Sequence, residues 1–459
     1  MESYELVVLG GGLAGMCAAV EAGEQGASVL LLEKQDELGG STVLSSGYMA
    51  FAGTDMQEKA GIVDSTQSLL NDMVEVGGGV NLQELIDAYG EHQLETYLWL
   101  RDHGVEFRTL QAVSGHSVPR GHTIDPHQGI QSLYQKAKQL PNVTIKLNAP
   151  AKRLIKNQAG KIEQVLYLED GQEQTVTASK GVLLASGGFA KSEELLKLFA
   201  PQLDPALRIG GEGNHGDGLQ MAWEHGAWVL DLPYLSGTYG FHPSANSAVK
   251  SQGLAFYKGG IIVNQLGKRF VNESLSYKLL GNAALRQPEG ITYQIWDQTV
   301  MDQAVADDPL YDFGLLKRRR LLYEVDTLEE LADCIDVPVE VLAETITQYN
   351  EGINNGKEPE FGRESLTHHY GTPTPIDKAP FYAFESTVAM LATYAGVAVN
   401  AQGQVLNPYN EPIPGLYAAG EVTGGFHGAG YVTGSSLGKC AVFGRLAVQK
   451  ALKKATEVL

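Results

Sequence analysis

Three glycines and one acidic residue near the start of the chain have the types and spacing needed to bind a dinucleotide. Gly10, Gly12 and Gly15 form a GxGxxG pattern, and Glu33 lies eighteen positions after Gly15. Glycines at these positions permit a tight turn, close approach of backbone N–H groups to phosphate, and close packing of a helix on a strand. A carboxylate at Glu33 can accept hydrogen bonds from both ribose hydroxyls. The pattern therefore predicts a site for the pyrophosphate and ribose of a dinucleotide.

The segments around these residues predict a βαβ unit that positions them. Residues 6–9 and 29–32 are short apolar runs, typical of buried parallel strands, and a helix is expected to begin near Leu13. The N-terminus of that helix points its positive end at the phosphates. Because strand, glycine turn, helix, strand and terminal acid occur in order, the pattern argues against a merely glycine-rich turn.

Later segments extend the same architecture. Residues 143–146, 151–155 and 162–167 alternate around the turn NQAG and predict a small antiparallel meander. Residues 181–185 return to a buried-strand pattern and run into further glycines. The predicted fold class is α/β, with a Rossmann-like domain that combines a parallel sheet with this antiparallel meander.

The middle of the chain has a different character. A chain of 459 residues exceeds the size at which one core usually keeps growing, so we expect two domains. Residues 235–391 are rich in aromatic side chains and contain acidic helices, whereas residues 392–459 regain the glycine-rich character of the first segment. We therefore predict a nucleotide-binding domain formed by residues 1–234 and 392–459, interrupted by an α+β capping domain formed by residues 235–391.

Composition restricts the partners. With 34 basic and 54 acidic side chains the formal charge is −20, which argues against nucleic acid or an anionic membrane as a partner. The three cysteines, Cys17, Cys334 and Cys440, have no CxxC or CxxCH spacing, so no metal, iron–sulfur cluster or c-type haem site is predicted. Electrons must then pass to or from a separate partner. The start of the chain enters the first strand directly, and no apolar stretch reaches about 18 residues, so a cytoplasmic protein without an integral membrane segment is expected.

Five further motifs follow the N-terminal pattern in order: GGS at 39–41, ASGGF at 185–189, GDG at 216–218, VNQLGKRFVNES at 263–274 and GLYAAGEVTGGFHG at 415–428. Together they make the whole chain resemble the fumarate reductase/succinate dehydrogenase flavoprotein family. The resemblance implies an FAD domain with a cap, and hydride transfer between flavin N5 and one carbon of a Cα–Cβ bond beside a carbonyl, coupled to proton transfer at the other. The FAD contacts that it implies are Gly10, Gly12, Gly15, Glu33, Lys34, Gly40, Ser41, Ala185, Gly188, Asp217, Gly420, Glu421, Ser436 and Leu437.

Two consequences for the cofactor follow. A final helix that opens at Ser436 can stabilise negative charge near N1 and O2 of reduced flavin through its N-terminal N–H groups. Some members of the family attach FAD covalently through a histidine in the segment after the second strand. This chain has GGSTV there, so we expect non-covalent FAD.

The chain departs from the fumarate reductase pattern where that family places cations. Tyr277 stands four residues after the RFVNE motif and Tyr431 four residues after His427, and both positions carry arginine in fumarate reductases. Histidines expected near Tyr234 and near Leu391 or Ala392 are also missing. Because a dicarboxylate without these cations would leave buried carboxylates unpaired, the substrate is expected to be uncharged.

Tyr277, Tyr431 and Thr433 resemble the 3-oxosteroid 4-dehydrogenase branch of the family, which has serine at the third position. The resemblance implies a hydrophobic ketone or enone as substrate. Tyr277 would donate or accept the proton at Cα, Tyr431 would be its partner or orient the carbonyl, and Thr433 or the backbone at Gly434 would bind the carbonyl. The alternatives are packing roles for both tyrosines and a capping role for Thr433.

Other candidates and functions remain open. The segment containing Arg120 and His122 can hold a carbonyl or carboxylate or be a loop fixed against FAD, and Tyr257 can line the pocket or fill the cap core. The main hypothesis is a flavoenzyme acting on a Cα–Cβ bond beside a ketone, as a dehydrogenase or an enone reductase. One alternative is a reductase of unsaturated carboxylic acids in which Arg120 binds the carboxylate, and another is a non-catalytic electron-transfer flavoprotein.

Overall fold

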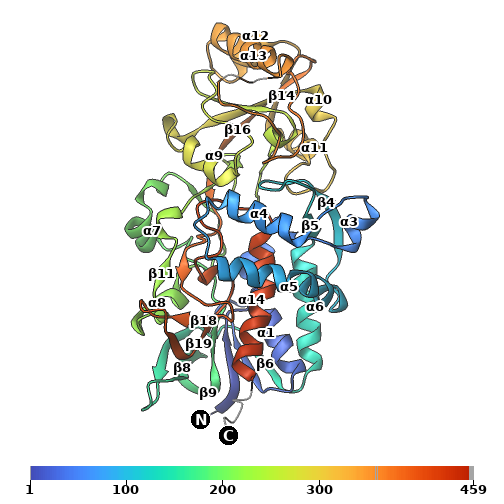
Figure 1. Ribbon diagram of the computed structural model, residues 1–459. Coiled ribbons are helices and arrows are strands. Elements are labelled where there is room, and N and C mark those ends of the chain that lie inside the picture. Colours follow the sequence, from blue (N-terminus) through green and yellow to red (C-terminus); the bar gives the residue numbers. More distant parts are fainter. Residues whose placement is uncertain (1, 357, 359, 454–459) are drawn as a thin grey trace.

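The protein is built around two large sheets that lie one above the other along its long direction (Figure 1). The computed structural model describes residues 2–356, 358 and 360–453. The nucleotide-binding sheet is at the bottom of the view and the cap sheet at the top, with α4 (Thr66–Val76) between them. None of the helices in this part of the chain is both long and apolar enough to cross a bilayer.

The lower sheet contains the predicted βαβ unit. Six of its eight strands follow the order β18-β19-β9-β1-β2-β6, and β8 pairs with β9 and β7 with β8. Strand β1 pairs in parallel with both β2 and β9, and α1 (Leu13–Glu24) connects β1 to β2. The bounds are β1 Glu2–Leu9, β2 Val29–Leu32, β6 Val143–Lys146, β7 Ala151–Lys156, β8 Ile162–Glu169, β9 Gln172–Leu184, β18 Gln404–Leu406 and β19 Pro412–Ala418.

The meander differs from the prediction in one strand. Strand β6, expected within the meander, pairs in parallel with β2, and the antiparallel meander consists of β7, β8 and β9. Helix α6 (Pro126–Gln139) leads into β6 and packs against α1, which places β6 at the edge beside β2. The alternation of a four-residue strand does not indicate which strand it pairs with. The assignment of this strand to the meander was wrong because tertiary packing decides the pairing.

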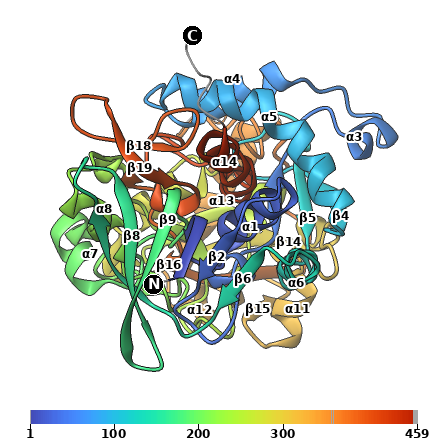
Figure 2. The same ribbon diagram turned by 90° about the horizontal axis from the view of Figure 1, so that it is seen from below.

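Helices cover the lower sheet. Seen from below, α1 lies beside α14 (Ser435–Leu452), and α4 and α5 (Gln83–Asp102) lie outside them (Figure 2). Strands β1 and β2 are buried from Leu6 to Leu9 and from Val29 to Leu32, as expected for a covered parallel sheet. Helices α7 (Glu193–Phe199) and α8 (Asp217–Glu224) lie at the side of β8 and β9 (Figure 2).

The upper sheet forms the cap. Its order is β10-β16-β14-β13, and β12 and β15 also pair with β16. The cap has a separate apolar cluster that includes Ile261, Ile295, Leu342 and Phe381. The bounds are β10 Leu207–Arg208, β12 Thr238–Phe241, β13 Ile261–Asn264, β14 Thr292–Asp297, β15 Leu322–Val325, β16 Phe381–Met390, α9 Tyr277–Ala284, α10 Gln298–Met301, α11 Phe313–Arg318, α12 Leu328–Cys334 and α13 Val339–Asn354.

Two antiparallel strands connect the cap to the lower part. The chain enters through β12 and returns through β16, and the two strands pair directly. Strand β10, from the segment predicted to belong to the nucleotide-binding domain, pairs with β16 as well. The smaller elements are α2 Gly40–Val43, α3 Asp55–Lys59, the sheet of β3 Tyr48–Ala50, β5 Gly121–Ile124 and β4 Phe107–Gln111, and the pair β11 Val229–Leu230 with β17 Gly396–Val397.

Candidate active site

A cavity of about 480 Å³ extends from the carboxyl ends of β1 and β2 to the base of the cap. Its nucleotide end includes Gly10, Gly12 and Glu33, and its cap end includes Tyr277 and Thr433. The predicted site residues that line it are Gly10, Gly12, Glu33, Lys34, Gly40, Ser41, Ala185, Asp217, Tyr277, Gly420, Glu421, Tyr431, Thr433, Gly434, Ser436 and Leu437. The structure thus brings both predicted sets together.

The predicted glycines fall into two groups. A Cβ on Gly15 would lie 1.9 Å from the Gly10 carbonyl oxygen, and one on Gly188 would lie 2.2 Å from the Glu421 carboxylate. Neither of these two residues lines the cavity, so both are required by packing behind it. A Cβ on Gly12 would meet only ordinary contacts beyond 3.6 Å, and one on Gly40 would meet no atom within 4 Å. These two glycines face open space of the kind that a pyrophosphate needs.

The carboxylate of Glu33 is fixed at the end of β2. The backbone N–H of Gly11 donates to Glu33 Oε2 at 2.7 Å, and that of Gln35 donates to Oε1 at 2.8 Å. Carboxylate oxygens have further lone pairs, so Glu33 can also accept from ribose hydroxyls. Beside it, Lys34 forms an ion pair of 2.5 Å with Asp217 at the start of α8. The nucleotide end therefore fits the polar parts of a dinucleotide.

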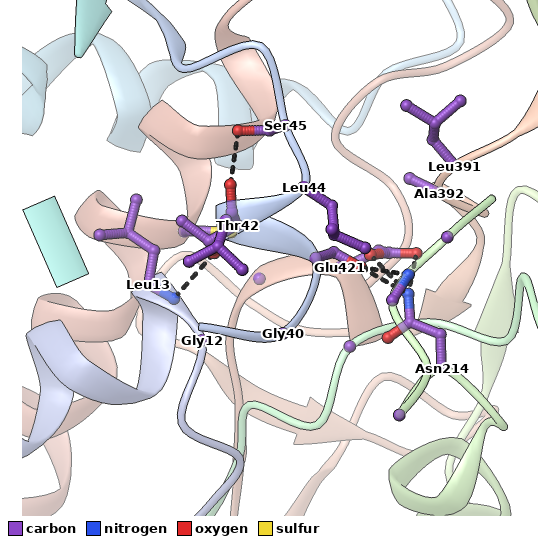
Figure 3. Close-up of a pocket in the computed structure, with 18 of the residues that line it drawn as sticks. Gly12, Leu13, Gly40, Thr42, Leu44, Ser45, Asn214, Leu391, Ala392 and Glu421 are labelled. Atoms are coloured by element: carbon purple, nitrogen blue, oxygen red, sulfur yellow. Dashed lines mark hydrogen bonds between the residues drawn. The ribbon is translucent and has the colours of Figure 1, made fainter. Parts of the chain in front are cut away.

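Polar side chains fix the segment that follows the glycine turn (Figure 3). The backbone N–H of Leu13 donates to the Thr42 hydroxyl at 3.1 Å. The Asn214 amide donates to the Ser41 hydroxyl at 2.8 Å and to the Glu421 carboxylate at 3.3 Å. Thr42 and Asn214 were not predicted from the sequence, although both lie within three residues of the motifs GGS and GDG.

Tyrosines form the cap end of the cavity. Tyr277 is the first residue of α9, and its ring centroid lies 5.8 Å from that of Tyr431. Tyr394 stacks on Tyr431 with centroids 4.8 Å apart, and its backbone is left-handed at φ 55°. The Ser276 hydroxyl donates to the Tyr431 carbonyl at 3.0 Å, which joins the start of α9 to the loop before α14. Burial, reinforced by Tyr431, raises the pKa of Tyr277 well above 10, while the Thr433 hydroxyl opposes the shift.

The backbone N–H and carbonyl of Thr433 are both hydrogen-bonded, whereas its side-chain hydroxyl is not. Its N–H donates to the Ser114 carbonyl at 3.0 Å, and its carbonyl accepts from His116 Nε2 at 2.7 Å. Its hydroxyl is buried, lies near enough to the Tyr277 hydroxyl to oppose the rise of that group's pKa, and has no hydrogen-bond partner at ordinary bonding distance among the described residues. A buried hydroxyl without a hydrogen bond costs free energy, which a hydrogen bond to a ligand would recover.

Helix α14 begins directly after these residues. Gly434 is its N-cap at φ 91°, and no side chain caps the first turn. A Cβ on Gly434 would lie 2.8 Å from the backbone of Met49 and Ala50, so the turn requires glycine. Ser436 and Leu437 of the first turn line the cavity, and the helix starts at Ser435, one residue before the predicted start.

Buried charges lie behind the tyrosines. Lys278 donates to the Ser236 carbonyl at 3.1 Å and lies 4.4 Å from the Tyr394 ring centroid. Burial lowers the pKa of Lys278 to about 7 and that of Lys439 to about 8. Burial also raises the pKa of Glu421, which accepts from the backbone N–H of Thr393 at 3.0 Å.

Three candidate substrate residues do not line the cavity. The guanidinium of Arg120 is fully buried, with its Nε 2.7 Å from Asp64 Oδ2 and a further ion pair to Asp72. His122 contacts the Thr54 hydroxyl at 2.8 Å, and burial lowers its pKa to about 4. The Tyr257 hydroxyl donates to the Leu275 carbonyl at 2.6 Å. The polar groups of all three are used by the protein itself, so we do not assign them to substrate.

Leu391 and Ala392 line the cavity where a histidine was expected from the dicarboxylate enzymes (Figure 3). Among the described lining residues, Lys34 is the only lysine or arginine, and no histidine occurs. The cap end is therefore an aromatic, aliphatic and hydroxyl surface.

The βαβ unit, the open glycine cradle and the cavity beneath a cap define a dinucleotide-dependent oxidoreductase of the flavoprotein class. The chain belongs to the FAD binding domain family, whose model matches residues 5–437. This membership makes it a fumarate reductase/succinate dehydrogenase-like flavoprotein and an FAD-dependent oxidoreductase of the class that acts on unsaturated carbon–carbon bonds.

Individual relatives cover nearly the whole chain. The chain is 30% identical to a fumarate reductase (cytochrome) of Shewanella frigidimarina, over 98% of this chain and 77% of that protein. It is 29% identical to a vinyl phenol reductase of Lactiplantibacillus plantarum, over 93% and 91%. A solved structure of 3-ketosteroid Δ4-(5α)-dehydrogenase from Rhodococcus jostii RHA1 superposes with a TM-score of 0.80 at 26% identity, covering 98% of this chain and 97% of that one.

Proposed function

We propose that this protein reduces, or in reverse forms, a carbon–carbon double bond conjugated to an uncharged carbonyl. The observation that carries the proposal is the buried, unpartnered hydroxyl of Thr433 at a cavity end lined without lysine or arginine. A carbonyl oxygen can accept from that hydroxyl, whereas a carboxylate would be desolvated there without a counter-charge. The resemblance to the ketosteroid dehydrogenase supports the same substrate class.

The residues divide the chemistry between them. Bound FAD would supply or accept the hydride. Thr433 would hold the carbonyl oxygen and stabilise negative charge on it, and Tyr277 would transfer the proton at Cα. Tyr431, whose hydroxyl accepts from the Gly434 N–H at 3.2 Å, would orient Tyr277 and the turn that carries Thr433. Leu310, Leu391 and Ala392 would exclude water around the substrate.

The acidity of the Tyr277 phenol bears on which direction of the reaction is faster at neutral pH. Because burial raises the pKa of Tyr277 well above 10, its phenol carries a proton at neutral pH. A protonated phenol is the form that donates to Cα during reduction of an enone. Dehydrogenation would need the phenolate, so we propose that enone reduction is the faster reaction at neutral pH.

We propose that FAD is held without a covalent bond, since GGSTV at 39–43 lacks histidine and so do the described lining residues. Gly12 and Gly40 would accommodate the pyrophosphate, Gly10 would form the tight turn before it at φ 111°, and Glu33 would bind the ribose. The N-terminus of α14 would face the flavin ring. A separate electron donor would complete the cycle, as the three cysteines form no cluster-binding motif.

The vinyl phenol reductase favours a second candidate substrate class. Its name indicates an alkene conjugated to a phenol, which is also an uncharged oxygen compound. In that case Thr433 would bind a phenolic oxygen in place of a ketone. Both substrate classes would bind in the same neutral pocket. An assay that includes a compound of each class can separate them.

The test is anaerobic reoxidation of the chemically reduced holoenzyme, followed by flavin absorbance. The panel contains a cyclic enone, a 4-ene-3-ketosteroid, a 4-vinylphenol, fumarate and urocanate. We expect rapid reoxidation by an uncharged member and slow reoxidation by the acids. Faster turnover of fumarate than of every neutral compound would contradict the proposal, and no reoxidation by any member would favour an electron-transfer role.

A further inference from the structure

Two histidines of the cap and a glutamate of α4 meet at a cluster that is not part of the cavity lining. Glu75 lies in the last turn of α4, and His368 and His369 lie in the return segment before β16. One ligand atom from each of the three lies within 4.8 Å of the others. These residues come from the lower and upper parts of the molecule, and no sequence motif links the two segments that carry them.

The distances between the ligand atoms of these side chains are close to those between the ligands of a bound metal ion. Glu75 Oε1 lies 3.0 Å from His369 Nε2, and Glu75 Oε2 lies 3.7 Å from His368 Nε2. Two ligand atoms around tetrahedral Zn²⁺, with bonds of about 2.0–2.1 Å, are separated by roughly 3.4 Å. These two distances lie on either side of this value, and the two imidazole nitrogens lie within 4.8 Å of each other, so the three groups would have to draw together to enclose one ion.

His368 supplies an independent observation. Its Nε2 atom is buried and has no hydrogen-bond partner in the described part of the chain. Its backbone is left-handed at φ 33°, a conformation that costs a non-glycine residue about 1 kcal/mol or more. A strained backbone that directs an unpaired imidazole nitrogen toward two other ligand atoms is typical of a functional constraint.

We propose that Glu75, His368 and His369 bind one divalent zinc ion that joins the cap to α4. Two imidazoles and one carboxylate are a ligand set that zinc accepts, with the fourth position left to water. The Asp72 carboxylate, whose Oδ1 lies 3.7 Å from the same His368 Nε2 atom, adds negative charge beside the proposed cation.

The proposed site is connected to Thr433. Asp72 Oδ2 accepts from the Ser117 backbone N–H at 2.8 Å, and the adjacent His116 donates from Nε2 to the Thr433 carbonyl at 2.7 Å. Zinc would therefore hold the cap segment next to the loop that fixes the catalytic turn. This inference does not depend on which compound the enzyme reduces.

The experiment uses the FAD-loaded full chain after treatment with EDTA and dialysis. Zinc chloride is titrated by calorimetry, and Co²⁺ is added separately to follow the absorption of a tetrahedral nitrogen and oxygen site. We expect one zinc per chain and a higher midpoint of thermal unfolding, because zinc binds the folded state preferentially. His369→Ala and Glu75→Gln should each weaken zinc binding by about tenfold or more.

His127→Ala is the matched control, since His127 is an exposed histidine on α6 away from this cluster. It should bind zinc as the unmodified protein does, and FAD absorbance reports that each variant is folded. Absence of a stoichiometric zinc site in the unmodified protein would overturn the proposal. Equal zinc affinity in His369→Ala, Glu75→Gln and the control would overturn it as well.

Discussion

At the nucleotide end of the cavity, Glu33 has both carboxylate oxygens hydrogen-bonded to backbone N–H groups, whereas at the cap end the Thr433 hydroxyl is buried without a partner. The glycine turn and the ribose-binding acid of the nucleotide end are also local in sequence, because Gly10, Gly15 and Glu33 belong to one βαβ unit. The cap end joins Ser276 to Tyr431 across 155 positions. The first end is completed by its own backbone, and the second keeps hydrogen-bonding capacity for a ligand.

This difference indicates how the fold separates stability from specificity. Gly15 lies behind the cradle, so its packing is needed whether or not a cofactor is present. Thr433 contributes an unsatisfied group, which lowers stability until substrate arrives. Substitutions at the two ends should therefore change different measured quantities.

The largest effect is expected at Gly15. Gly15→Ala places a Cβ 1.9 Å from the Gly10 carbonyl oxygen, which should lower the free energy of unfolding by about 3 kcal/mol or more and abolish FAD retention. Gly12→Ala is the matched variant, since its Cβ meets the protein only beyond 3.6 Å. We expect that variant to fold but to lose FAD. Thermal unfolding of the purified proteins measures the stability of each variant, and flavin absorbance measures the FAD that it retains. Equal destabilisation of Gly15→Ala and Gly12→Ala would contradict the distinction between the two glycines.

The second prediction concerns the proton. Tyr277→Phe should lower kcat by about 10²–10⁴-fold with FAD still bound, because the ring remains and only the acidic hydroxyl is removed. Tyr239→Phe serves as the control. Its hydroxyl lies 2.6 Å from the Thr292 hydroxyl in the cap and is not part of the cavity lining, so its loss should affect stability by about 1 kcal/mol and leave kcat close to normal. Steady-state kinetics with the best compound of the panel would decide, and normal kcat in Tyr277→Phe would remove it from the mechanism.

The third prediction separates function from stability at a single residue. Thr433→Val keeps the shape and removes a hydroxyl that has no partner, so the midpoint of thermal unfolding should stay equal or rise. The same change should lower kcat/KM by about 10²-fold, because a donor to the developing oxyanion is lost. A clear fall in the unfolding midpoint would indicate that the hydroxyl has a structural role, as a cap of the turn before α14.

The sequence predicted the nucleotide end well because its requirements are local. A GxGxxG turn between apolar runs at 6–9 and 29–32 constrains backbone, helix and strand within one unit, and the structure has all of them. The resemblance also placed Tyr277, Tyr431 and Thr433 at one cavity end, and the structure brings them together. Their catalytic roles stay predictions.

What the sequence could not provide depends on contacts between distant segments. Arg120 is a cation in a polar loop, and only the fold shows that Asp64 and Asp72 neutralise it. In the same way β6 has the pattern of a strand, but the packing of α6 against α1 selects β2 as its partner. The cluster of Glu75, His368 and His369 is invisible in sequence because α4 and the cap segment meet only in the folded chain.

The last prediction is a change in how the free energy of unfolding varies with pH, and it compares the charged layer behind the cap end with the rest of the molecule. The folded-state pKa of Lys278 is lowered to about 7 from 10.5 by burial. Between these values the unfolded chain binds a proton that the folded chain does not, so this group makes the protein more stable as pH rises, by up to about 1.4 kcal/mol per pH unit. Below pH 7 both states are protonated and the contribution to the slope disappears.

Lys278→Met should therefore flatten the rise of the unfolding free energy between pH 7 and 10.5, measured by urea denaturation at several pH values. Loss of the hydrogen bond to the Ser236 carbonyl shifts the whole curve by a constant amount and does not alter its slope. Lys439, with a pKa of about 8, remains in the variant and supplies the slope that persists. Parallel curves for the variant and the unmodified protein would mean that Lys278 keeps an ordinary pKa in the folded state, and the layer behind the tyrosines would then be hydrated.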